Sequence, residues 1–120
     1  MWCDYHGVEV VDGGVAIVYK AVNQSWMSDW GCRYAPGSTP EAGDWRDDDK
    51  CGGGLHFSPL PTQAHEYYRG STVARFLRVG IPLTEMRPLT RQGGAPKCKA
   101  RRVVVPCVEV DLFGKELNPV

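Results

Sequence analysis

Sequence features that would direct the protein to a membrane or out of the cell are missing from its 120 residues. No apolar run reaches the roughly eighteen residues that a membrane-spanning helix needs, so we expect no membrane association. Residues 1–10 contain neither a basic region nor an apolar core of signal-peptide length. The sequence therefore predicts a cytoplasmic protein.

The chain also lacks a net charge, because its 14 basic and 14 acidic residues cancel. Bulk charge therefore does not favour nucleic-acid binding. The charges are nevertheless segregated, with five acids in residues 41–49 and five bases but no acid in residues 91–102. Alternation places Lys97, Lys99 and Arg101 on one face of an extended chain. This stripe either meets an anionic partner or is solvated, and we favour a solvated face.

No disulfide framework is visible, since the five cysteines are an odd number without paired spacing. Zinc sites usually show ligand pairs two to four residues apart, and only Cys3 and His6 have such a spacing. Cys98 and Cys107 are too far apart to form such a pair. We therefore expect small buried or half-buried thiols and no metal site.

The N-terminal half begins with strand signals. Residues 14–22 ("GVAIVYKAV") are rich in β-branched and aromatic residues and predict a strand. They follow an Asp-Gly-Gly turn signal, across which residues 7–11 can pair as a hairpin. Residues 23–50 mix tryptophans with Gly, Pro, Ser and Asp, which indicates a long irregular loop.

One clear helix is predicted, at about residues 61–69. Proline is favoured in a first turn, and Gly70 stands where a helix commonly ends. Strands are predicted at residues 54–58 and 72–82, and one or two more at 100–113, where Pro106 requires an edge position or a bulge. The pattern predicts a single compact α+β domain over residues 1–120, with about five mostly antiparallel strands.

The segment "CGGGLHFS" at residues 51–58, followed by Ala64 and Tyr67-Tyr68, carries a family resemblance. It resembles the glycine–apolar–tyrosine–phenylalanine–small run of ADP-ribosyltransferases, in the poly(ADP-ribose) polymerase branch. The resemblance implies an ADP-ribosyltransferase-like layout and makes NAD or ADP-ribose a possible ligand. It puts His56 at the position of the tyrosine that stacks on nicotinamide. Lys20, in "VYKAV", takes the position of the residue that grips the NAD ribose.

The sequence differs from the ADP-ribosyltransferase family at one signature position. The third signature residue of that family is a glutamate at the start of a late strand, where this chain has Lys97, Cys98 or Lys99. Catalysis depends on charge placed where the transition state develops, so we expect binding rather than efficient transfer. No catalytic residue is assigned. A divergent NAD-dependent ADP-ribosyltransferase remains an alternative, and whether the protein is an enzyme stays open.

The whole chain also resembles an uncharacterised family of small proteins from actinobacteria and their phages. The shared features are "YKA", the "CG.GLH" pattern and a terminal basic strand. This second resemblance implies a phage or bacterial accessory protein, in the host cytoplasm if it is phage-encoded. It implies no known activity.

We predict a ligand-binding cleft whose central residue is His56. Its neighbours Leu55 and Phe57 point to the opposite face of the strand, and imidazole suits stacking or proton transfer near neutral pH. Each candidate also has a structural interpretation: a hydrogen-bonded histidine, a tight glycine turn, a serine that caps the helix, and a lysine that extends from an edge strand. The predicted cleft residues are Lys20, Gly52, Gly54, His56 and Ser58.

The alternative function is a protein-interaction module, such as a phage structural or host-targeting factor. Exposed aromatic side chains commonly anchor interfaces. The residues that would serve here are Trp26, Trp30 and Trp45 of the 23–50 loop, with a host or phage protein as the partner.

Overall fold

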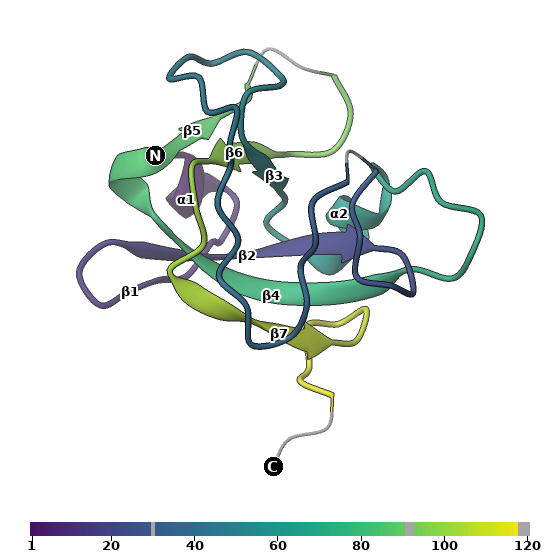
Figure 1. The fold of residues 1–120 in the computed structure, drawn as a ribbon. Coiled ribbons are helices and arrows are strands. Elements are labelled where there is room, and N and C mark those ends of the chain that lie inside the picture. The colour runs from purple at the N-terminus through teal and green to yellow at the C-terminus, as the bar shows by residue number, and fades with distance from the viewer. Residues whose placement is uncertain (30, 91–92, 118–120) are drawn as a thin grey trace.

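Two antiparallel β-sheets form the body of the chain (Figure 1). The computed structural model describes residues 1–29, 31–90 and 93–117. Within these ranges the larger sheet has the order β1-β2-β4-β7, and the smaller one has the order β3-β6-β5. The strands are β1 (Val10–Val11), β2 (Val15–Val22), β3 (Leu55–Phe57), β4 (Arg75–Pro82), β5 (Met86–Pro88), β6 (Cys98–Ala100) and β7 (Val105–Val110).

The larger sheet is centred on β2 and β4, which pair over their whole lengths. The predicted hairpin between β1 and β2 is confirmed, and its turn holds Asp12 and Gly13 in the left-handed region. Pro106 lies in β7, an edge strand whose pairing with β4 shifts between Arg78 and Gly80. Both expected consequences of this proline are thus present, because its missing N–H is tolerated at an edge.

The smaller sheet has β6 in its centre, with His56 of β3 directly opposite Lys99. The two sheets meet at Tyr19 of β2 and Ser58, just after β3. The amide of each donates a hydrogen bond of 2.9 Å to the carbonyl of the other. This reciprocal pair joins the two sheets.

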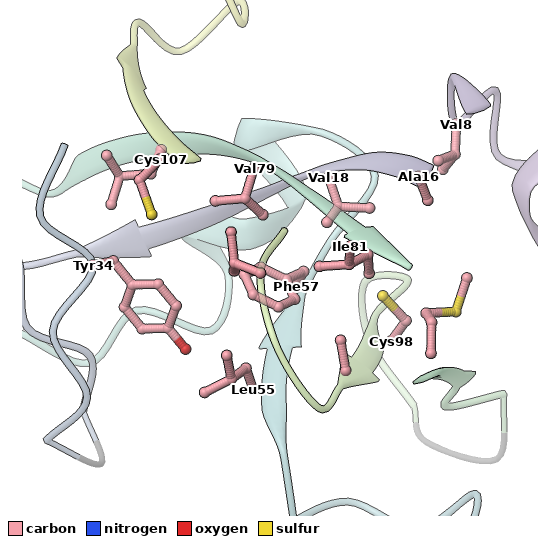
Figure 2. Packing of buried hydrophobic residues seen from close by; sticks show 14 of the residues in the cluster. Val8, Ala16, Val18, Tyr34, Leu55, Phe57, Val79, Ile81, Cys98 and Cys107 are labelled. Carbon is pink, nitrogen blue, oxygen red and sulfur yellow. The ribbon is translucent and has the colours of Figure 1, made fainter. Parts of the chain in front are cut away.

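The core lies between the sheets (Figure 2). Val18, Val79 and Ile81 of the larger sheet are buried against Phe57 of the smaller one. Tyr34, from the long loop, packs edge-on against Phe57 with ring centroids 6.0 Å apart. The loop is thereby attached to the core. Cys98 and Cys107 are buried thiols and Cys3 and Cys32 are half-buried, as expected, whereas Cys51 is exposed, contrary to that expectation.

Three expectations about the elements need correction. The helix predicted over residues 61–69 is α2 (Pro61–His65), which lies beside β2 (Figure 1). It ends early because the amides of Tyr67 and Tyr68 donate to carbonyls three residues back, and the Tyr67 hydroxyl donates to the Ala95 carbonyl. A second short helix, α1 (Trp2–Tyr5), and a 3₁₀ turn, η1 (Leu83–Glu85), were not expected. The described strands number seven rather than about five.

The chain is thus a single α+β domain of mostly antiparallel strands with two short helices. None of the helices within the described ranges is long and apolar enough to cross a bilayer.

Gly80 is predicted to be indispensable for the pairing of β4 with its neighbours. A Cβ atom there would lie 2.6 Å from Val105 Cβ and 2.8 Å from Val15 Cγ1. We expect Gly80→Ala to lower the free energy of unfolding by about 1–3 kcal/mol in urea titrations. Gly43→Ala is the matched control, because a Cβ at that exposed glycine meets nothing within 4 Å. Equal stability of the two variants would contradict this packing.

Candidate functional site

A cavity of about 960 Å³ opens where the two sheets meet. Its volume lies in the range of about 300–1,000 Å³ that is typical of ligand pockets. The elements around it are β2, β3, α2 and the glycine turn before β3, which come together as Figure 1 shows. The structure brings all five residues predicted for a cleft to this cavity: Lys20, Gly52, Gly54, His56 and Ser58.

Lys20 stands on the core-facing side of β2. Ala16, Val18 and Val22, which share that side by the period of two, are buried. The ammonium lies 5.4 Å from the centroid of the Tyr34 ring, and within the described ranges it has no ion-pair partner. Burial lowers the pKa of Lys20 to about 8, although the charge of Asp29 opposes that shift.

His56 points away from the core, because Leu55 and Phe57 take the buried face of β3. Its Nε2 accepts a hydrogen bond of 3.2 Å from the Gly52 amide, so the neutral ring carries its proton on Nδ1. Burial, together with the charges of Lys20 and neighbouring lysines, lowers the pKa of His56 to about 4. The expected titration near neutrality is therefore wrong, and at neutral pH His56 is an uncharged donor.

The glycines of the turn at residues 52–54 line the cavity, and close packing against the long loop also requires them. Gly52 and Gly53 have φ values of 93° and 63°, which side-chain-bearing residues rarely adopt. A Cβ at Gly53 would lie 2.6 Å from Arg46 Nε, and one at Gly54 would lie 3.1 Å from the Trp45 ring. The turn is therefore held tightly against residues 45–46 of the long loop.

Ser58 does not cap α2. The helix begins after Leu60, whose amide hydrogen-bonds to the side chain of Gln63 at 3.1 Å, and no hydroxyl caps it. Ser58 is instead buried at the sheet junction, with its backbone paired to Tyr19. Its side chain belongs to the wall of the cavity.

The remaining charged groups make the cavity electropositive. Arg46, Arg69 and Lys97 line it in addition to Lys20, against two acids, Asp29 and Asp44. Lys97 Nζ lies 3.5 Å from the sulfur of Cys51 and 4.5 Å from the centroid of the Tyr67 ring. An excess of cations in a partly enclosed space favours an anionic ligand.

The expected solvated basic face is wrong for Lys99, whereas Arg101 of the same stripe is exposed. The Lys99 side chain is fully buried, pairs with Asp48 and donates to the Gly52 carbonyl at 3.1 Å. It also lies 5.5 Å from the centroid of the Trp45 ring. The acidic loop of residues 41–49 thus folds over β6. The opposite charges of the two segments were the sequence signal for this contact.

The described tryptophans of the long loop are half-buried rather than free at the surface. The Arg75 guanidinium lies 4.3 Å from the centroid of the Trp26 ring. Trp45 packs against the glycine turn and Lys99. Trp30 lies outside the described residues. An interface made by these three side chains therefore remains a prediction.

Comparison with known proteins identifies a family but no activity. A family model with the description "Domain of unknown function (DUF7666)" matches residues 16–113. No curated protein and no solved structure matches the chain.

The neutral state of His56 predicts an acid-sensitive fold. Its pKa is about 4 in the native chain against 6.5 when unperturbed. Between these values the unfolded chain takes up a proton that the native chain does not, so stability falls as the pH is lowered from 6.5 towards 4. His56→Gln should abolish a loss of up to about 3 kcal/mol in urea titrations across this window. The exposed His65→Gln is the control, and an identical acid slope in all three proteins would refute the assignment.

The buried ammonium of Lys99 predicts an asymmetric pair of substitutions. Asp48→Asn leaves a buried positive charge without its counter-ion, whereas Lys99→Met removes that charge and leaves a solvated carboxylate. We expect Asp48→Asn to be the more destabilising, and Lys99→Met to stay within about 1 kcal/mol of the parent. Asp47→Asn, in a more exposed pair with Arg87, should change little. The reverse order in thermal unfolding would show that Lys99 is not buried as a cation.

Proposed function

The chain belongs to the DUF7666 family, whose function is unknown, and from that premise we propose a function that rests on the cavity itself. The domain binds a small anionic, nucleotide-like ligand of the ADP-ribose or NAD class between β2 and β3. It acts as a binding protein rather than a transferase.

The observation that carries the proposal is the shared position of Lys20 and His56. They come from different sheets, yet both line the one cavity because Tyr19 and Ser58 join those sheets. These are also the two positions that the ADP-ribosyltransferase resemblance assigns to the ribose-gripping and nicotinamide-facing residues. An ADP-ribosyltransferase-like layout is therefore part of the proposal.

The lining of the cavity suits such a ligand. Arg46, Arg69 and Lys97 offer charge-assisted hydrogen bonds to phosphate oxygens. Tyr67 contributes aromatic surface to the same wall, which is the usual companion of a few polar groups in a ligand pocket. His56 adds a neutral donor at Nδ1.

The start of β6 argues against transfer chemistry. In the family that the chain resembles, this position supplies a glutamate. Here Lys97 lines the cavity, Cys98 is buried, and Lys99 is paired with Asp48. A positive charge at that place would oppose an oxocarbenium-like transition state. A binding or accessory role, of the kind that the likeness to actinobacterial and phage proteins implies, fits these residues better.

Ligand-induced stabilisation tests the proposal. ADP-ribose or NAD at about 100 times its dissociation constant should raise the melting temperature by roughly 10 °C, because only the native state binds it. We expect Lys20→Met and Lys97→Met to weaken binding about tenfold or more through the loss of a charged donor. Lys115→Met removes an exposed lysine that does not line the cavity and should leave binding unchanged.

Two results would contradict the proposal. One is the absence of a melting shift with either nucleotide at millimolar concentration. The other is an equal shift in the parent, Lys20→Met and Lys97→Met, which would place the ligand elsewhere. If loss of Trp26 or Trp45 then abolished capture of a protein partner, the interaction-module alternative would replace it.

A further inference from the structure

Lys20 differs from the other four lysines of the chain, all of which lie within the described ranges. Lys99 is neutralised by Asp48, Lys97 contacts a thiol and an aromatic ring, and two more are exposed at the surface. Lys20 alone combines a half-buried position in a cavity wall with the lack of any ion pair or hydrogen bond within the described residues. A ligand held in the cavity would lie beside Lys20.

The surroundings of this amine favour its uncharged form. Burial is the main cause that lowers its pKa to about 8, and the charge of Lys97 acts in the same direction. Asp29 and the thiols of Cys32 and Cys98 oppose the shift without cancelling it. A larger fraction of Lys20 is therefore the free amine near neutral pH than of an ordinary lysine. The free amine is the form that attacks carbonyl groups.

We propose that Lys20 forms an imine with the aldehyde of an anionic reducing sugar held in the cavity, such as the open-chain form of ADP-ribose. The inference rests on the proposed function, because Arg46, Arg69 and Lys97 must first hold the phosphates beside the amine. It deepens that function by naming the reactive group of the ligand and the residue that meets it.

The step balances without an oxidant or a reductant. The Lys20 nitrogen adds to the aldehyde carbon and gives a carbinolamine. Both protons of the amine pass to the former carbonyl oxygen, which leaves as water while the carbon–nitrogen double bond forms. The half-enclosed position of Lys20 limits the water that would reverse the reaction.

This chemistry separates two ligands that bind alike. ADP-ribose has a free anomeric carbon, so its terminal ribose opens to an aldehyde. In NAD the same carbon is bonded to nicotinamide and cannot open. Both should occupy the cavity, and only ADP-ribose should react with Lys20.

Borohydride trapping on the full chain tests the inference. After brief incubation with ADP-ribose and reduction, intact mass spectrometry should show one added ADP-ribose less one oxygen atom, and peptide mapping should place it on Lys20. Labelling of Lys20 should be much faster than that of Lys50, because only Lys20 lines the cavity that holds the ligand. NAD should give no adduct.

Lys20→Arg is the decisive variant because it keeps the positive charge and removes the nucleophile. It should lose the adduct, whereas Lys50→Arg, at an exposed position that does not line the cavity, should retain both the melting shift and the adduct. In the parent chain, a melting shift without an adduct would overturn the imine and leave ligand binding intact. Labelling spread evenly over the lysines would do the same. Neither a shift nor an adduct would overturn both proposals.

Discussion

The two hydrogen bonds between Tyr19 and Ser58 set the geometry on which the cavity depends. They join the larger and the smaller sheet at one residue pair, and the period of two then decides where the next side chains point. Lys20 directly follows Tyr19, and His56 lies two residues before Ser58. The pairing of Tyr19 with Ser58 therefore fixes the direction of both side chains. On β3, a slip by one residue would exchange the core face of Leu55 and Phe57 with the cavity face of His56.

The cavity concentrates positive charge that the fold only partly offsets. Asp48 neutralises Lys99, whereas Lys20 lies over an aromatic ring and has no ion-pair partner within the described residues, and His56 is uncharged. Charged groups held without a counter-ion cost folding free energy and are commonly found where proteins bind or react. A bound anion would add negative charge beside Lys20, in keeping with the excess of cations that line the cavity.

Much of the fold is predictable from local pattern, and the main failures are non-local. The β-branched residues of 14–22, the single proline of β7 and the glycines before β3 predict elements that the structure contains. The burial of Lys99 is different, because alternation shows which side chains share a face but not what covers that face. The early end of α2 likewise depends on the hydroxyl of Tyr67 reaching Ala95 from across the loop. That the five predicted cleft residues line one cavity depends on contacts between distant segments, such as Tyr19 with Ser58, which no local pattern predicts.

The most direct test of the central claim is the backbone-amide NMR spectrum of the chain titrated with ADP-ribose. Binding at the sheet junction predicts that the largest shift changes fall on Lys20, His56 and the glycines of the turn. Changes confined to β7 or the C-terminal segment, or none at a saturating concentration, would contradict an anion-binding cavity between the two sheets.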